Sequence, residues 1–236
     1  MWGFVGGSAL LIGAIVGLKV TARQQIIGIV MAFGAGVLIS ALAFELTEEA
    51  FTQGGTDAVV IGLGAGSFSF FAGDWIINRS GGRHRKRSSG EQADGGGAAI
   101  ALGALMDGIP ESIAIGVSLL AGNGVGIAMV AAVFLSNLPE SLSAATGMKK
   151  AGHSSRFILG LWTGVMLAST LASASGYAFL GGAPPNVIAV IQAFAAGAIL
   201  TMLADTMMPE AFENGGSLVG LVTVLGFASS FLLSRV

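Results

Sequence analysis

The chain has 236 residues, of which 53% are hydrophobic and 10% are charged, and its mean hydropathy is +0.82. So little charge, with a net charge of −2, excludes an ordinary soluble domain of this length and predicts a protein that crosses the membrane several times. Cysteine is absent, which excludes disulfides, thiol nucleophiles and thiolate metal ligands. Any metal bound by this chain is therefore held by oxygen or nitrogen.

Eight hydrophobic stretches are long enough to cross about 30 Å of hydrocarbon. They are residues 2–18, 26–46, 57–77, 98–121, 124–147, 157–180, 186–208 and 217–234. The first lacks the basic flank and the cleavage site of a signal peptide, so we count it as a membrane span. We expect an all-α membrane protein in which residues 1–236 form a single domain of eight transmembrane helices.

The positive charges are distributed on one side of this arrangement. Ten of the 11 Lys and Arg residues lie between predicted spans one and two, three and four, or five and six. These loops share one face, which the positive-inside rule makes cytoplasmic, so we expect a plasma-membrane protein with both termini extracytoplasmic. The segment 79–97 mixes basic residues with Ser and Gly, which predicts a flexible loop. Topology explains its charge, and we expect no nucleic-acid partner.

An internal repeat relates the second predicted span to the seventh. Residues 32–55 and 193–216 match at 11 of 24 positions without a gap. The two spans are five apart and so cross the membrane in opposite senses, which is typical of transporters that alternate access around a midplane site. The repeats and their flanks carry candidate residues for an ion pathway: Glu45, Glu48, Glu49, Asp205 and Glu210.

These pathway candidates differ in how strongly the sequence favours a functional role. Asp205 lies inside an apolar run, where a charged group usually faces a cavity or a partner. Glu45 is similar but closer to the end of its span. For Glu48, Glu49 and Glu210, a solvated helix end is an equally good interpretation.

The strongest functional signal is a pair of related motifs, DGIPES at 107–112 and SNLPES at 136–141. Asp107 and Glu111 are four residues apart, as are Ser136 and Glu140, so each pair lies on one face of its helix. The proline of each motif removes an amide donor and frees the carbonyl four residues earlier. Buried carboxylates and free carbonyls in lipid need an internal partner, and a bound cation would serve. The two motifs therefore predict a metal site between the fourth and fifth spans.

These two motifs, PEAF in the seventh span and the loop after the third span resemble the ZIP family of divalent metal transporters. The resemblance covers essentially the whole chain and implies a 3+2+3 inverted-repeat arrangement of the eight helices. It also implies a binuclear metal centre between the fourth and fifth helices. Its first metal would be held by Asp107, Glu111, Ser136 and Glu140, and its second would draw on Gly108, Asn137 and an acidic residue of the sixth helix.

The sequence departs from the ZIP pattern at the second metal. Gly108 has no side-chain ligand, and residues 157–180 contain no Asp or Glu, so we expect one metal ion. Asp107 stands where the family usually has His, which leaves ligands of oxygen alone. Ligand softness then favours harder ions such as Mn²⁺, Mg²⁺ or Ca²⁺. The resemblance implies Zn²⁺, with Mn²⁺, Fe²⁺ or Cd²⁺ as alternatives, and no organic cofactor is expected.

We therefore predict a carrier of a divalent metal cation, and no enzymatic activity. A proton-coupled carrier of an organic solute could use the same carboxylates as a proton relay. An intramembrane aspartyl protease using Asp107 and Asp205 is a weaker alternative, because the usual Gly-x-Gly-Asp setting is missing.

Small and aromatic residues complete the sequence expectations. We interpret Gly13, Gly17, Gly62 and Gly66 as positions where helices pack closely. Helix faces of small residues are equally compatible with contacts in a homodimer. Interfacial anchoring in the bilayer is the interpretation for Trp2, Trp75, Trp162 and Tyr177.

Overall fold

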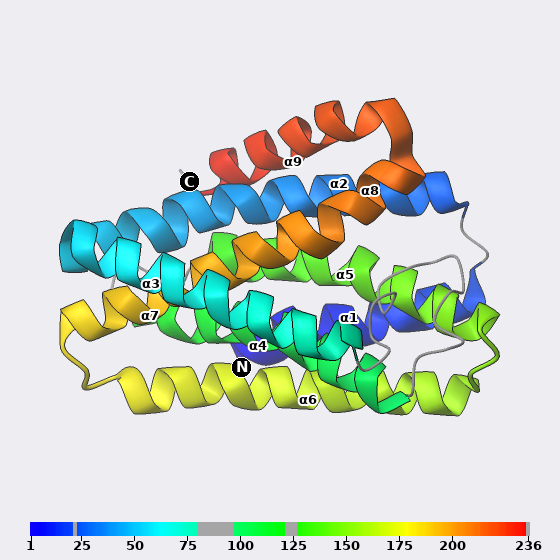
Figure 1. The fold of residues 1–236 in the computed structure, drawn as a ribbon, viewed down its shortest axis with the longest axis horizontal. Coiled ribbons are helices and arrows are strands. Elements are labelled where there is room, and N and C mark those ends of the chain that lie inside the picture. Colours follow the sequence, from blue (N-terminus) through cyan, green and yellow to red (C-terminus); the bar gives the residue numbers. More distant parts are fainter. Residues whose placement is uncertain (21–22, 80–96, 121–126, 235–236) are drawn as a thin grey trace.

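A computed structural model describes residues 1–20, 23–79, 97–120 and 127–234 (Figure 1). All secondary structure in these ranges is helical, which confirms the all-α class. The elements are α1 (Trp2–Lys19), α2 (Gln24–Ala41), η1 (Leu42–Thr47), α3 (Glu48–Ile77), α4 (Gly97–Ser118), α5 (Ile127–Lys150), α6 (Ser155–Leu180), α7 (Pro185–Met202), η4 (Leu203–Met207), α8 (Met208–Gly215), η5 (Gly216–Leu218) and α9 (Val219–Leu233). Most of the predicted loop 79–97 lies outside the described residues.

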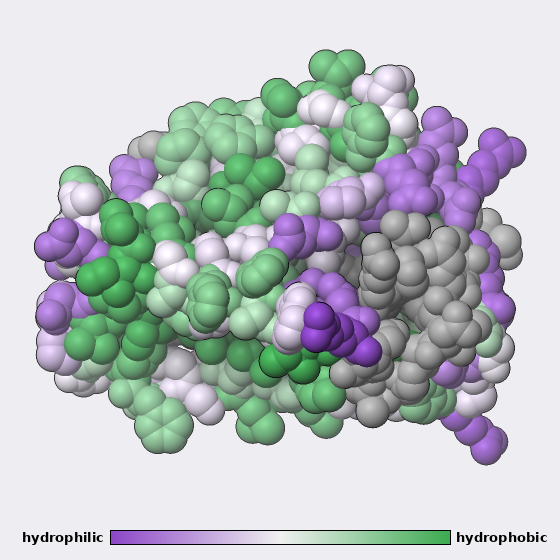
Figure 2. Space-filling model, in the orientation of Figure 1, coloured by the Kyte–Doolittle hydropathy of each residue, from purple (hydrophilic) through white to green (hydrophobic). Residues whose placement is uncertain are grey.

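Within these described ranges, six helical segments are long and apolar enough to cross a bilayer. Figure 2 shows a largely hydrophobic surface over the middle of one face and hydrophilic side chains at both ends. A hydrophobic band between two polar ends is typical of a protein that spans a membrane. The fold is thus that of an all-α membrane protein.

Two of the six segments are much longer than a single crossing of about 20 residues requires. The segment Gln24–Ile77 has 54 residues, and Pro185–Leu233 has 49. Each reverses direction at a glycine with positive φ, 70° at Gly55 and 65° at Gly216, a conformation that residues with a side chain rarely adopt. Figure 1 shows the result, because α3 folds back from α2 and α9 folds back from α8.

The internal repeat extends to the local backbone. The alignment that matches residues 32–55 with 193–216 also places Gly55 on Gly216 and the π-helical turn η1 on the π-helical turn η4. π-Helical turns are rare and occur frequently at functional sites. Two such coincidences support a common origin for the two segments.

The packing of the helices follows the same relation. Helix α3 packs along α7, and its repeat counterpart α9 packs along α2, the counterpart of α7. In the same way α1 packs on α5, while α6 packs on α4. Exchanging α1 with α6, α2 with α7, α3 with α9 and α4 with α5 therefore converts each of these contacts into another contact of the fold.

Glycines permit the closest helix approaches in this symmetric packing. A Cβ atom on Gly66 would lie 2.0 Å from the carbonyl oxygen of Phe194, and one on Gly226 would lie 2.1 Å from that of Phe33. Phe33 and Phe194 occupy the same repeat position. Added Cβ atoms would also clash with neighbouring helices at Gly13, Gly17 and Gly62. The packing interpretation of these glycines is confirmed.

Leu at position 66 should destabilise the fold, whereas Leu at position 64 should not. Gly66 lies against the backbone of α7, while an added Cβ at Gly64 of the same helix would meet no atom within 4 Å. Overpacking costs about 1–3 kcal/mol or more, so Gly66→Leu should lower the thermal midpoint by roughly 5 °C. Thermal unfolding in detergent measures this, and equal midpoints for the two variants would contradict the α3–α7 packing.

The hydrophobic core divides into a large cluster and smaller ones. The largest cluster joins α2, α3, α7, α8 and α9 to one side of α4 and α5. A smaller cluster is built only from α1, α4, α5 and α6. Trp162 is 2% exposed and belongs to this smaller cluster, so its interpretation as an interfacial anchor is wrong. Its side chain points into the bundle from α6, a direction that composition does not reveal. Helices α4 and α5 thus lie between the two parts of the molecule.

Candidate metal site

Helices α4 and α5 bring the two proline motifs into the interior. Both helices continue through their prolines, Pro110 and Pro139. Asp107 and Glu111 are each 1% exposed, and Glu140 is 3% exposed. Three carboxylates therefore lie buried on two neighbouring helices, within the apolar runs that surround both motifs.

Glu111 of α4 and Ser136 of α5 meet across the interface between the two helices. The Ser136 hydroxyl lies 3.5 Å from Glu111 Oε1 and 3.0 Å from the carbonyl oxygen of Val133. A hydroxyl has one proton and two lone pairs, and the shorter contact is the better hydrogen bond. Donation to Val133 leaves lone pairs of Ser136 Oγ available to a cation beside Glu111.

Asn137 and Gly108 face other helices. The amide nitrogen of Asn137 donates to the carbonyl oxygen of Gly6 in α1, at 3.4 Å. A Cβ atom on Gly108 would lie 3.1 Å from Ser169 Oγ of α6. The two positions that the ZIP resemblance assigns to a second metal thus contact α1 and α6, where no side chain between 157 and 180 is acidic.

The described residues contain no group of three acidic or histidine side chains that converge closely enough to hold a metal ion. A metal ion between α4 and α5 would therefore be bound by fewer carboxylates, with the Ser136 hydroxyl, backbone carbonyls or water completing its coordination. The ligand set of Asp107, Glu111, Ser136, Asn137 and Glu140 remains a prediction.

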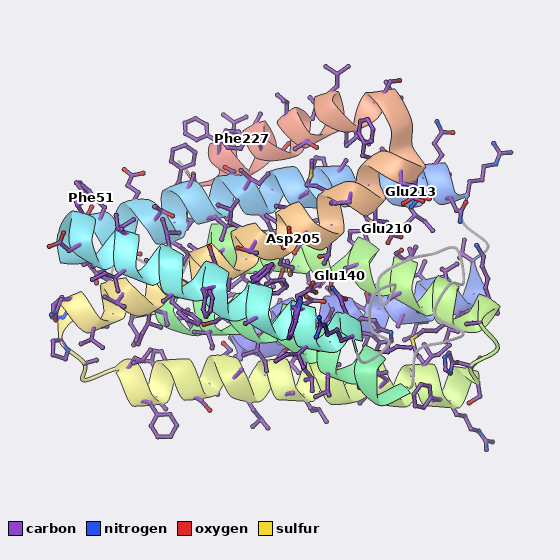
Figure 3. The ribbon with its side chains drawn as sticks, in the orientation of Figure 1. Phe51, Glu140, Asp205, Glu210, Glu213 and Phe227 are labelled. Atoms are coloured by element: carbon purple, nitrogen blue, oxygen red, sulfur yellow. The ribbon has the colours of Figure 1, made fainter. Side chains whose placement is uncertain are left out.

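Glu210 is the pathway candidate whose position is most informative. It is 4% exposed, and its Oε1 accepts a hydrogen bond of 2.6 Å from Ser143 Oγ of α5. Ser143 lies three residues after Glu140 and so on the same helix face. Figure 3 shows Glu140, Glu210 and Glu213 following one another toward the end of the bundle where α8 meets α9. Glu210 is therefore no solvated helix end, and it contacts the same helix, α5, that carries Ser136 and Glu140.

Asp205 is exposed and lines a cavity of about 390 Å³ (Figure 3). Asp74 of α3 lines the same cavity and is 9% exposed. Asn78 donates a hydrogen bond to Asp74, and the Arg79 guanidinium lies 3.8 Å from the centre of the Trp75 ring at the cavity edge. Sequence reasoning missed Asp74, although an acid inside an apolar run is the signal that singled out Asp205. The protease alternative pairs Asp205 with Asp107, but Asp107 is not among the residues that line this cavity.

The acidic side chains near the reversal at Gly55 are more exposed to solvent than Glu210. Glu48 is exposed and Glu45 is partly exposed. Glu49 accepts a hydrogen bond of 2.9 Å from Gln53, and the fully buried Gln192 of α7 lies beside it. Glu49 and Glu210 occupy the same repeat position, yet only Glu210 is buried. The two ends of the candidate pathway therefore differ in how deeply their equivalent carboxylates are buried.

No protein-family model and no curated protein matches this chain. The functional assignment consequently depends on the residues, the internal repeat and the site geometry.

Proposed function

We propose that this chain is a ZIP-type carrier that moves a divalent metal cation across the plasma membrane into the cytoplasm by alternating access, and that it is not an enzyme. The observation that carries the proposal is the contact between Glu111 and Ser136, which joins two buried oxygen-bearing motifs of adjacent helices inside an inverted repeat. Asp107 and Glu140 are the further candidate carboxylate ligands, although no three acidic side chains converge among the described residues, and Asn137 would support the site from the side of α1.

The spacing of the two facing oxygens is compatible with a bound metal ion. Ligands about 2.1 Å from Zn²⁺ in a tetrahedron lie roughly 3.4 Å from one another. The observed separation of Glu111 Oε1 and Ser136 Oγ is 3.5 Å. An octahedral Ca²⁺ site with ligands at about 2.4 Å has a similar edge, so this distance is compatible with either ion. We propose Zn²⁺ as the substrate, with Mn²⁺, Fe²⁺ or Cd²⁺ as alternatives.

Eight crossings in a 3+2+3 arrangement are part of the same proposal. The reversals at Gly55 and Gly216 divide the two long helical segments into two crossings each, which supports eight in total. The exchange relation among the helices supports the inverted repeat, with α4 and α5 as its central pair. The positive-inside rule then places both termini outside.

The proposed route leads from Glu111 past Glu140 to Glu210 and on to the cytoplasmic ends of α5 and α8. Asp74 and Asp205 would attract cations at a cavity on the same half of the molecule, and Glu45, Glu48 and Glu49 would do so on the outer half. A hydrophobic cluster built only from residues of α1, α4, α5 and α6 supports a movement of these helices as a unit against the others.

Flux into sealed proteoliposomes tests the function. The purified protein should transport at least one of Zn²⁺, Cd²⁺, Mn²⁺ and Fe²⁺, each compared with Mg²⁺ and Ca²⁺. Transport of none of these ions, together with proton movement that depends on an organic solute, would favour the proton-coupled carrier instead.

Single cysteines should report the topology, because the chain has no native thiol. Thr56 and Ser217 are exposed and lie directly after the two reversals. In intact cells, a membrane-impermeant maleimide should label Thr56→Cys from outside and should reach Ser217→Cys only after the membrane is opened. Labelling of both from the same side would contradict the inverted repeat.

A further inference from the structure

A groove between α4 and α6 lies apart from the proposed ion route. It has a volume of about 620 Å³, and its lining is apolar except at one end, where Arg156 lies in the first turn of α6. Leu105, Phe157 and Ala168 are among its walls. This volume is in the range of sites that hold small organic ligands.

The length of the groove matches one leaflet of a bilayer. Its lining on α6 extends from Arg156 to Ala168. At a rise of 1.5 Å per residue, this stretch of helix is about 18 Å long. Half of the hydrocarbon core is about 15 Å thick. A groove that starts at headgroup depth would therefore accommodate an acyl chain down to the bilayer centre.

Two glycines of the groove have no role in helix packing. An added Cβ at Gly160 or Gly164 would meet no atom within 4 Å, whereas an added Cβ at Gly13 would lie 2.3 Å from the Leu138 carbonyl oxygen. Gly160 and Gly164 are four residues apart and so share one helix face. The absence of side chains at these two positions opens the groove.

The charge at the mouth indicates the headgroup. Arg156 is exposed, and residues 149–168 contain no Asp or Glu but do contain Lys149 and Lys150 near the start of α6. Basic residues on this side face the cytoplasmic leaflet, whose lipids carry negative charge. We propose that the groove binds an anionic phospholipid of the cytoplasmic leaflet, with the lipid phosphate on Arg156 and an acyl chain along Gly160 and Gly164. This proposal rests on the proposed membrane orientation but is independent of metal transport.

Filling the groove tests the acyl-chain part of the proposal. The full chain is reconstituted into nanodiscs of equal phosphatidylglycerol and phosphatidylcholine, and native mass spectrometry counts the lipids retained after gentle detergent release. The wild-type protein should retain phosphatidylglycerol, and Gly160→Leu and Gly164→Leu should lose it. Gly220→Leu is the matched control, because this exposed glycine of α9 also has open space around it but lies outside the groove. Equal retention by wild type and both groove variants would overturn the proposal.

Arg156 tests the headgroup part and does not depend on the folding of the leucine variants. One Arg near the surface contributes a factor of about five to binding of an anionic lipid. Arg156→Gln should reduce the preference for phosphatidylglycerol over phosphatidylcholine by about that factor, and Arg156→Lys should retain most of it. Millimolar inorganic phosphate should leave the retained lipid in place. An unchanged preference in Arg156→Gln, or release of the lipid by phosphate, would contradict an anionic-lipid site.

Discussion

Replacing Glu140 or Glu111 with Gln is expected to reduce metal transport by more than about 100-fold while leaving the protein folded in the membrane. Residues that only support a metal ligand typically contribute 10–100-fold, so loss of a ligand carboxylate should exceed that range. Gln keeps the shape of the buried side chain and removes its charge, which separates the loss of a ligand from the loss of packing. Metal uptake into proteoliposomes at equal protein density measures the effect.

Thermal stability provides a second readout for the same two variants. A ligand that binds only the folded state raises the thermal midpoint by mass action, and a protein that no longer binds the metal loses this increase. Asp57→Asn is the matched control, because Asp57 is an exposed acid of α3 outside the proposed route. If Glu111→Gln and Glu140→Gln both transport at the wild-type rate, the metal site does not lie between α4 and α5.

The sequence was most informative where local residue pattern decides the structure. Uninterrupted apolar runs predict helices in lipid, because every backbone group must be satisfied within the helix. The shared GG endings of the two repeats mark the reversals at Gly55 and Gly216, which need a residue without a side chain. The i, i+4 spacing of the proline motifs predicts one polar face on each helix, and Ser136 of one motif lies 3.5 Å from Glu111 of the other.

Other features depend on contacts between distant segments and could not be obtained from spacing. The burial of Glu210 is a consequence of α8 lying against α5, where Ser143 donates to its carboxylate. Asn137 follows Ser136 by one residue, so its side chain points about 100° away and reaches Gly6 of α1. Ser143 is 67 residues from Glu210 in the sequence, and Gly6 is 131 residues from Asn137, so local spacing cannot predict either contact.

The two repeats have also diverged at equivalent positions. Asp205 aligns with Phe44, whose ring packs on Phe231 at 5.0 Å and Phe227 at 6.0 Å between centroids. One copy thus uses this position for aromatic packing against α9, and the other places a carboxylate beside Asp74. An alignment identifies the equivalence of the two positions but not which of them lines a cavity.

Replacing Asp107 with His should shift metal preference toward Zn²⁺ over Mn²⁺ by roughly tenfold, equivalent to about 1.4 kcal/mol. Imidazole is the softer donor and suits Zn²⁺, whereas carboxylate oxygen suits harder ions. The change also removes one negative charge from a buried region that contains Glu111 and Glu140, which weakens the attraction for any cation held mainly by charge. Competition uptake assays on the two proteins measure the ratio, at one fixed pH because His must be deprotonated to bind a metal. Asp107→Asn serves as the control that removes the charge without adding a nitrogen ligand from an imidazole. If Asp107→His and Asp107→Asn show the same order of metal preference, the side chain at position 107 does not contact the transported ion.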